Sequence, residues 1–580
     1  MLRAAVRGLM LWALYASLLV WHTWPLAARS TTHLAEMAPG SGFDALYSAW
    51  VLAWQSHALT TGGVAVAMAN IYHPTPDALY YGPVAFGALP FFAPTFLVTG
   101  NPTLALNVLL LGGIALSAAA IHFVVTRWTG WQSAGLVAGV SFAANRWLLV
   151  TFVPRTPHIA VLCYFPLIIA LAARPRLTTR GALLLCALVV AQGLTDAAYV
   201  APAAILPLAG VAVVLLTRPG SRPRGVRILG AVAAATLILA IVYAPYRAVA
   251  ERNPELFQQT LWKAEPERVV LQLPGDLMGA VTPLAIATLV PLMILIAGVV
   301  VALRSWRGST AEASAWRHAL WWTAAGIVIS LPLSVGWQGR IYRLPHLDVL
   351  RAHESLARIL ANPDRLRVAA LCGIALLSGL AFAELLRHAR CGGEDLGARC
   401  GRGVAALVIC AAVYVQFAWA IGQPVSYWPA SFTRMTLTET PRDSPVLREL
   451  RRRGGPTVEV PVPPQDSPLF ETTAMFRSIF HWQPLLNGYG SFWPAGFEER
   501  MRLAARLPDP EALRALQHDA GLEFVLVRTG QDPRVEAQRL AWLEVAARGT
   551  RSDLTLVASD DDLLLFRASG RPAQLTDRTR

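Results

Sequence analysis

The stretch GFDALYSAWVLAWQSHAL, residues 42–59, carries an acidic side chain, Asp44, whose position suggests chemistry. Asp44 follows the first long apolar run of the chain and precedes a helical period that begins at Ala45. A carboxylate held at the start of a helix can accept the proton of a hydroxyl group, which is the task of a general base. Aspartate is also one of the best residues at a helix N-cap. The residues alone leave both roles open.

The helix predicted after Asp44 has two distinct faces. One is shared with Asp44, and the other is aromatic, so its tryptophans would anchor the helix at a membrane interface. The face of Asp44 carries Tyr47, Ser48, Val51 and Gln55, and the other face carries Trp50, Trp54 and His57.

Residues 69–83, ANIYHPTPDALYYGP, gather tyrosines, a histidine and an aspartate in a segment with three prolines. Sugars are commonly held by aromatic faces and hydroxyl-bonding side chains, so Tyr72 and His73 are candidate substrate-binding residues. The alternative is a proline-stiffened loop that carries polar groups without a ligand.

Other polar residues stand at the ends of predicted membrane spans. Arg155 and His158 lie where the fourth span begins, and Asp196 lies where the fifth ends. An ionisable group at membrane depth is costly, so it usually faces a cavity or a partner. Substrate binding is therefore predicted for these three residues, with a structural hydrogen bond as the alternative for His158.

Residues 339–370 are rich in arginine. Arginine offers forked donors that fit a phosphate or pyrophosphate, so a phosphate held at the membrane surface is one predicted ligand. A solvated basic face is the alternative. The arginines are Arg340, Arg343, Arg351, Arg358, Arg365 and Arg367.

The composition indicates a polytopic membrane protein. Of 580 residues, 55% are hydrophobic and 15% are charged, with a mean hydropathy of +0.45. A soluble domain carries about a quarter charged residues. The net charge of +14 comes almost entirely from arginine, because Lys263 is the single lysine. Much of that arginine lies in short loops between apolar runs, where it sets orientation, so nucleic acid is excluded as a partner.

About eleven spans are predicted, starting with an uncleaved first helix. Residues 84–98 are apolar but short and contain two prolines, so they are interpreted as re-entrant or as a broken extension of the second span. The other ten spans lie near 104–126, 132–150, 158–173, 181–199, 203–217, 226–246, 279–303, 317–335, 366–387 and 403–421.

The charge of the loops predicts the orientation. With the N-terminus in the cytoplasm, four short arginine-bearing loops fall inside, as the positive-inside rule requires. The first outer loop, 27–103, and the C-terminal segment, 422–580, then lie outside. This segment shows short strands and helical periods and is predicted to be a soluble α/β domain after a membrane domain at 1–421. The inner loops are 174–180, 218–227, 304–308 and 387–402.

Five blocks in order along the chain resemble those of bacterial multispanning proteins of the GT-C glycosyltransferase superfamily. They are GFDALYSAWVLAWQSHAL, ANIYHPTPDALYYG, RTPHIAVLCYFPLIIALA, NPDRLRVAALCGIALLSGLA and SIFHWQPLLNGYGSFWP. The resemblance implies an inverting transfer of a sugar from a polyprenyl-phosphate or polyprenyl-diphosphate carrier at the outer face of the membrane. It places the catalytic carboxylate in the first outer loop, at Asp44.

The same resemblance suggests roles for the remaining candidates. Arg365 is the first choice for stabilising the departing phosphate, with Arg343 and Arg351 next, and His158 and Tyr72 would orient the sugar or carrier. The expected partners are a lipid-linked sugar donor, membrane lipid and a glycan, lipid or protein acceptor, at a bacterial inner membrane. Asp44 has no adjacent acidic residue, so the DxD or Asp-Glu pattern of some branches is absent at this position; a divalent cation such as Mg²⁺ or Mn²⁺ is a possible cofactor that no such motif supports.

Two other classes of function remain open. A lipid-linked glycan translocase would hide charged groups in mid-bilayer, within interrupted spans. A cell-envelope assembly factor or scaffold would use Asp44 as a cap alone. The chain contains no P-loop, Rossmann glycine motif or HExxH, so cytosolic ATP is not expected to drive it.

Overall fold

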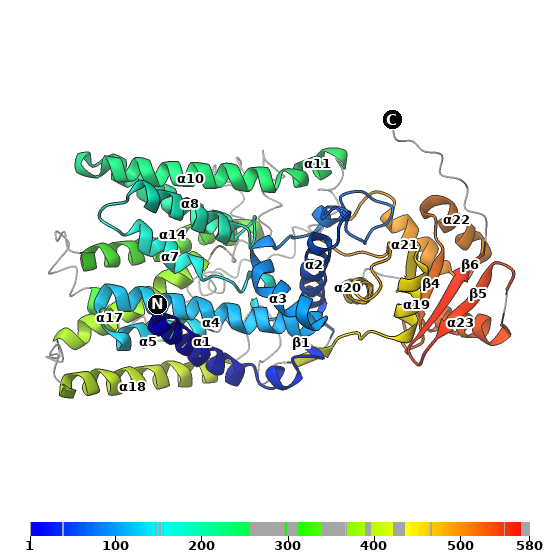
Figure 1. The fold of residues 1–580 in the computed structure, drawn as a ribbon, viewed down its shortest axis with the longest axis horizontal. Coiled ribbons are helices and arrows are strands. Elements are labelled where there is room, and N and C mark those ends of the chain that lie inside the picture. The colour runs from blue at the N-terminus through cyan, green and yellow to red at the C-terminus, as the bar shows by residue number, and fades with distance from the viewer. Residues whose placement is uncertain are drawn as a thin grey trace.

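The computed structural model has two parts, a helix bundle and a C-terminal α/β domain (Figure 1). The long helices run roughly along one direction, and the domain lies beyond one end of the bundle. The expected fold class, a polytopic helical protein with a C-terminal α/β domain, is confirmed. The structure describes residues 2–36, 40–145, 148–149, 152–154, 156–253, 296–298, 311–338, 366, 368–388, 396–421, 436–463, 467–549 and 551–569.

The helices of the bundle coincide with most of the predicted spans. Within the described residues, three are long and apolar enough to cross a membrane by length and composition: Pro102–Thr129, Pro219–Val242 and Val368–Arg387. The span predicted at 279–303 lies outside the described residues except at 296–298, so the total of eleven stays a prediction. The bundle helices are α1 (Leu2–His22), α4 (Pro102–Thr129), α5 (Gln132–Ala143), α7 (Tyr164–Ala172), α8 (Thr179–Gly193), α9 (Val200–Leu216), α10 (Arg222–Val242), α14 (Ala311–Gln338), α17 (Val368–His388) and α18 (Leu396–Ile421).

The apolar segment 84–98 forms the short helix α3 (Leu89–Thr99). Its 11 residues rise only about 16 Å, whereas the hydrocarbon core is about 30 Å thick. The chain then turns at Gly100, whose φ of +67° suits glycine, and Asn101 caps α4 by accepting the Leu104 N–H at 2.9 Å. Helix α3 alone is therefore shorter than the hydrocarbon core, and it packs against α4; whether the segment re-enters the membrane stays a prediction.

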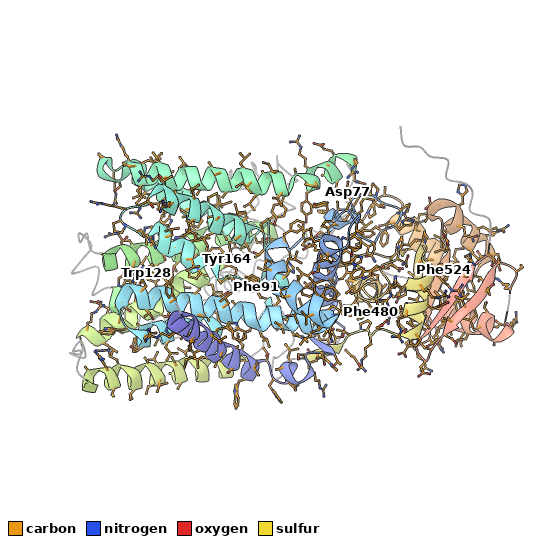
Figure 2. All side chains as sticks on the ribbon, viewed as in Figure 1. Asp77, Phe91, Trp128, Tyr164, Phe480 and Phe524 are labelled. Atoms are coloured by element: carbon orange, nitrogen blue, oxygen red, sulfur yellow. The ribbon has the colours of Figure 1, made fainter. Side chains whose placement is uncertain are left out.

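Arginine-rich connections lie at the end of the bundle away from the C-terminal domain. The links α7–α8 and α9–α10 are at this end, as are the last turn of α17 and the first turn of α18 (Figure 1). Figure 2 places Trp128, near the end of α4, toward the same end, and Asp77 at the junction with the domain. The separation of the arginine loops from the domain agrees with the predicted orientation, although the side that faces the cytoplasm stays a prediction.

The C-terminal domain contains a four-stranded sheet in the order β3-β4-β6-β5. β3 and β4 are parallel, and the other two pairs are antiparallel. All four strands lie in runs rich in valine and leucine, which are typical of strands: TVEVPVP (457–463), LEFVLVR (522–528), LTLVAS (554–559) and LLLFRA (563–568). The elements are β3 (Thr457–Val460), β4 (Phe524–Arg528), β5 (Leu554–Ser559), β6 (Leu563–Ala568), α19 (Pro445–Arg453), α20 (Pro468–Ser478), α21 (Phe497–Arg506), α22 (Pro510–Ala520) and α23 (Glu536–Arg548).

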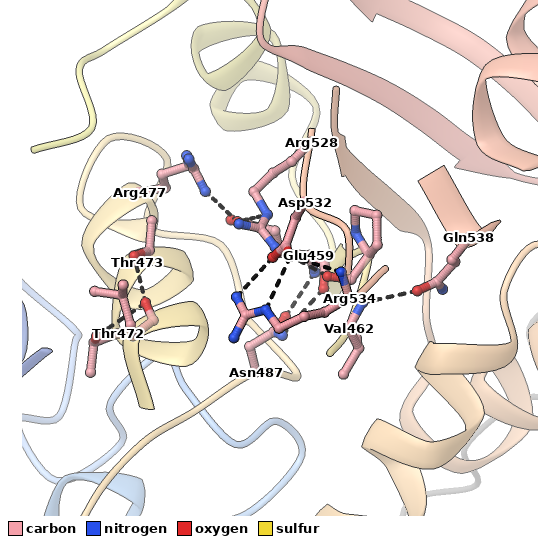
Figure 3. Close-up of polar contacts among 12 residues, drawn as sticks. Glu459, Val462, Thr472, Thr473, Arg477, Asn487, Arg528, Asp532, Arg534 and Gln538 are labelled. Carbon is pink, nitrogen blue, oxygen red and sulfur yellow. Dashed lines mark hydrogen bonds and ion pairs between the residues drawn. The ribbon is translucent and has the colours of Figure 1, made fainter. Parts of the chain in front are cut away.

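A buried carboxylate, Glu459 on β3, forms the charged centre of this domain (Figure 3). Arg477 pairs with its Oε1, and Nε of Arg528 lies 3.4 Å from the same oxygen. The Arg528 guanidinium also lies 4.4 Å from the centre of the Phe470 ring. Because a lone buried charge is costly, these arginines compensate Glu459 inside the domain.

Helix α2 (Phe43–Thr60) crosses the end of the bundle, between the long helices and the C-terminal domain (Figure 1). Strand β1 (His33–Glu36) precedes it and pairs antiparallel with β2 (Thr436–Glu439), which leads into the domain. Backbone hydrogen bonds thus join the first outer loop to the segment that leads into the C-terminal domain. The two paired strands are far apart in the sequence, because helices α4 to α18 lie between them.

Candidate active site

Asp44 lies in the first turn of α2, two residues beyond the N-cap position. The N-cap is Gly42, and no side chain there makes a capping hydrogen bond. The cap interpretation of Asp44 is therefore wrong, because the helix begins at Phe43 and Asp44 is already helical. Its side chain is half-buried, in the turn where the helix dipole favours negative charge.

A second carboxylate, Glu36, holds the turn before α2, and sequence reasoning missed it. Glu36 is buried and accepts the Gly40 N–H at 3.1 Å, while Gly40 adopts a φ of +86°. Burial raises the pKa of the Glu36 carboxyl, and hydrogen bonds from the backbone of Gly40, Gly42 and Ser41 oppose this rise. The turn residues GSG in the sequence are the signal that a preceding acid could receive these N–H groups.

His158 is joined to α2 one turn after Asp44. It lies in a 3₁₀ turn (Pro157–Ile159) and is 4% exposed. Its Nδ1 lies 3.0 Å from the Ser48 hydroxyl, which donates to the Asp44 carbonyl at 2.8 Å. Because the hydroxyl has one proton to donate, it accepts from His158, and Nδ1 is assigned as the protonated nitrogen. Asp44 and His158, predicted separately, thus belong to one hydrogen-bonded group.

Tyr47 fixes the other side of the first turns of α2. Its hydroxyl donates to the Pro83 carbonyl at 3.1 Å, and a Cβ on Gly82 would lie 2.2 Å from this hydroxyl, so Gly82 permits the approach. Tyr246, on α11 (Ala244–Arg252), donates to the Gly82 carbonyl at 2.6 Å and accepts the Val84 N–H at 3.0 Å. The end of segment 69–83 is therefore held between two tyrosines.

The pKa of the Tyr47 phenol is raised by burial and by the groups that surround it. Burial is the main cause that raises the pKa of the Tyr47 phenol. Three neighbouring groups raise it further: Tyr246, Tyr489 and Asp44. The phenol stays neutral at physiological pH and acts as a fixed hydrogen-bond donor beside the Asp44 carboxylate.

The tryptophans of α2 do not anchor the helix in a membrane interface, and that expectation is wrong. Trp50 is fully buried and Trp54 is 4% exposed. The Trp50 indole donates to the Asn70 side chain at 3.3 Å, and the Trp54 indole donates to the Val66 carbonyl at 2.8 Å. Protein groups cover both rings because the C-terminal domain and segment 69–83 pack over α2.

Tyr72 and His73 join the first outer loop to the C-terminal domain. The Tyr72 N–H donates to the Asn487 carbonyl at 3.1 Å, and the His73 N–H donates to the Leu485 carbonyl at 2.9 Å. The buried Tyr72 hydroxyl donates to the Phe492 carbonyl at 3.2 Å. Burial lowers the pKa of the half-buried His73 imidazole. Both residues are thus used in domain packing, and their binding of substrate stays a prediction.

Asp196 is buried, with 6% exposure, where α9 begins. Its Oδ1 accepts the Tyr199 N–H at 2.5 Å and the Val200 N–H at 3.3 Å. Asp196 also raises the pKa of Tyr246, after the larger effect of burial, so it lies near the tyrosines that hold segment 69–83. Its contacts stabilise the start of a helix, and a direct role with substrate is a prediction.

The arginines predicted to bind substrate lie outside the described residues, so their roles stay predictions. They are Arg155, Arg343, Arg351 and Arg365. Across the described part of the chain, no group of three His, Cys, Asp or Glu side chains is arranged to hold a metal ion. The described site is therefore a carboxylate, a histidine, a serine and tyrosines at the start of α2.

Comparison with known proteins finds similarity among solved structures but none to a family model or a curated protein. Among solved structures, the chain is similar to the crystal structure of ArnT from Cupriavidus metallidurans bound to undecaprenyl phosphate. The two share 12% sequence identity over 98% of each chain, with a TM-score of 0.45. The likeness extends over the whole length, at a score and an identity too low to assign an activity.

Proposed function

We propose that this protein is a membrane glycosyltransferase that moves a sugar from a polyprenyl-phosphate or polyprenyl-diphosphate donor to an envelope acceptor. The transfer takes place at the outer face and inverts the anomeric carbon. Asp44 is the general base. The proposal rests on the resemblance of the sequence blocks and on the surroundings of Asp44.

The observation that carries the proposal is the position of Asp44. It is a half-buried carboxylate at the junction of the bundle and the C-terminal domain, in a helix turn held by Glu36, Tyr47 and Ser48. A general base must be fixed in place and still within reach of the proton that it removes. The junction provides both conditions, because α2 is buried along most of its length while Asp44 is partly exposed.

The chemistry is a single displacement. The acceptor hydroxyl gives its proton to the Asp44 carboxylate as its oxygen bonds to the anomeric carbon, and the bond from that carbon to the phosphate oxygen breaks. The lipid phosphate leaves with the bonding electrons on the opposite side of the sugar. Arg365, followed by Arg343 and Arg351, would stabilise the charge of the departing phosphate. His158, fixed through Ser48, would orient the sugar or the carrier.

The test compares Asp44→Asn with Asp77→Asn in the purified full-length protein. The donor is the polyprenyl-linked sugar fraction, and the acceptor is the envelope fraction, both from a strain that lacks the gene. Asparagine keeps the size of aspartate but accepts no proton, so we expect Asp44→Asn to lower transfer by about 10²–10⁴-fold. Asp77 lies in the same loop as Asp44, 27–103, and pairs with exposed Arg252 of α11, so the Asp77→Asn variant should retain full transfer.

The outcome separates this function from a translocase. A translocase moves its substrate between compartments and forms no new glycosidic bond, so the wild-type protein in detergent would yield no product. Transfer by wild-type protein that survives in Asp44→Asn would remove Asp44 as the base. Loss of folding in that variant, seen as a large drop in melting temperature, would favour a structural role.

A further inference from the structure

A tyrosine of the C-terminal domain, Tyr489, contacts the turn that carries Asp44. The centre of its ring lies 5.9 Å from that of Phe43 at an angle of 71°, and 6.1 Å from that of Tyr47 at an angle of 76°. Edge-to-face contacts of this kind stabilise aromatic pairs. Phe43 and Tyr47 are four residues apart, so they share one face of α2 and bracket Asp44 in sequence.

The backbone around Tyr489 is held at each residue from 487 to 489. The Asn487 side chain donates through Nδ2 to the Glu459 carbonyl at 3.3 Å, and its Oδ1 accepts the Glu459 N–H at 2.7 Å. The Gly488 N–H donates to Glu471 at 3.0 Å, and the Tyr489 N–H donates to the sulfur of Met475 at 3.1 Å. Strand β3 and helix α20 therefore fix this loop within the C-terminal domain.

Two glycines let the same loop approach the first outer loop. A Cβ on Gly488 would lie 2.5 Å from the Tyr72 ring, and one on Gly490 would lie 2.6 Å from the Tyr81 carbonyl oxygen. The Tyr72 N–H donates to the Asn487 carbonyl in this interface. The loop is thus fixed from the domain side and seated against segment 69–83, and Tyr489 projects from it onto α2.

We propose that Tyr489 is a positioning residue for sugar transfer, which holds the first turn of α2 through Phe43 and Tyr47 so that the Asp44 carboxylate meets the acceptor hydroxyl. This inference rests on the proposed function. It gives the C-terminal domain a part in the reaction, because the domain supplies the ring that fixes the helix of the base. Misplacing a reacting group by about 1 Å can cost about 10²-fold in rate.

The experiment measures kcat and KM for Tyr489→Phe and Tyr489→Leu, with the donor and acceptor fractions described above. Phenylalanine keeps the ring and both edge contacts, so its kcat should stay well above that of Tyr489→Leu. Leucine removes both edge contacts, so kcat should fall about 10–100-fold while KM for the donor fraction changes less than about threefold.

Phe497→Leu is the matched control. Phe497 packs edge-to-face on Tyr72 at 4.8 Å, across the same domain junction but through segment 69–83 rather than α2. The Phe497→Leu variant should have a lower melting temperature than wild type and a kcat within about threefold of wild type. Phe43→Leu breaks one Tyr489 contact from the helix side and should lower kcat about 3–10-fold, even if Tyr489→Leu does not fold.

Equal kcat losses in Tyr489→Leu and Phe497→Leu would overturn the inference, as would a rise in KM alone. If the Tyr489→Leu variant does not fold, an unchanged kcat in Phe43→Leu would overturn the inference. In either case an active wild type and an inactive Asp44→Asn would leave the proposed function intact. A wild type without transfer would instead remove the proposed function itself.

Discussion

The carboxyl group of Glu471 predicts how stability depends on pH. Glu471 lies on α20, and burial is the main cause that raises its pKa from 4.5 to about 8. The Gly488 N–H and the Asn487 side chain oppose this rise, Glu459 adds to it, and Arg528 opposes it. The folded protein therefore holds a proton on Glu471 that the unfolded chain has already lost above about pH 4.5.

The sign and size of the effect follow from this difference. Between about pH 4.5 and 8 the folded state binds one more proton than the unfolded state, so the free energy of unfolding falls as pH rises, and above 8 the contribution stops changing. The free energy of unfolding changes by about 1.4 kcal/mol per pH unit in this range, so from pH 4.5 to 8 it falls by at most about 5 kcal/mol. The side chain keeps some solvent access, so the measured loss should be smaller, about 2–3 kcal/mol.

The assay is thermal unfolding of the purified protein in detergent from pH 5 to 9. Glu471→Gln stays neutral and can still accept the Gly488 N–H through its amide oxygen, so it should lack this pH dependence and exceed wild type in melting temperature at pH 8–9. Glu511→Gln, at a side chain that is 78% exposed in the same domain, is the control and should keep the wild-type slope. An identical slope in Glu471→Gln and wild type would refute the reasoning.

Three further substitutions test the site and its supports. Gly82→Ala places a methyl group against the Tyr47 hydroxyl. The steric overlap and the loss of the hydrogen bond to Pro83 should lower the free energy of unfolding by about 2–4 kcal/mol, measured by denaturant titration. Unchanged stability would mean that the Tyr47 side chain moves aside without cost. Ser48→Ala removes the link to His158 and should cost about 1 kcal/mol with a clear drop in transfer, whereas unchanged transfer would leave His158 outside the reaction. Arg252→Ala breaks an exposed ion pair and should change the melting temperature by no more than about 2 °C; a larger drop would show a buried role for this pair.

The elements near the site follow closely from local sequence, whereas their partners do not. The helical period after Asp44 predicts 42–59, and α2 runs from Phe43 to Thr60. The runs of valine and leucine likewise predict the strands of the C-terminal sheet, because alternation and burial are local signals. The error at the helix cap is a shift of two residues, which is within the usual uncertainty of helix ends.

Contacts between distant segments account for what the sequence could not provide. The tryptophans of α2 have the spacing of a membrane anchor, but segment 69–83 and the C-terminal domain cover them, and no local pattern reports such a cover. The residues GSG at 40–42 are the only local hint of the role of Glu36, and the contact itself forms when this turn folds back over the Glu36 carboxylate. The bond between Ser48 and His158 joins residues 110 positions apart. The residues around Asp44 mark it as a candidate and the resemblance suggests its role, whereas the groups that surround it come from distant parts of the chain.

The pairing of β1 with β2 has a consequence for biogenesis. His33 pairs with Glu439, so the strand that leads into α2 finds its partner only after about 400 further residues have been synthesised. Tyr489 and the other domain residues that hold α2 are made later still. A nascent or truncated chain could therefore insert its helices with Asp44 in an unsupported helix. Assembly of the site around Asp44 would then have to wait until the C-terminal domain has been synthesised and folded.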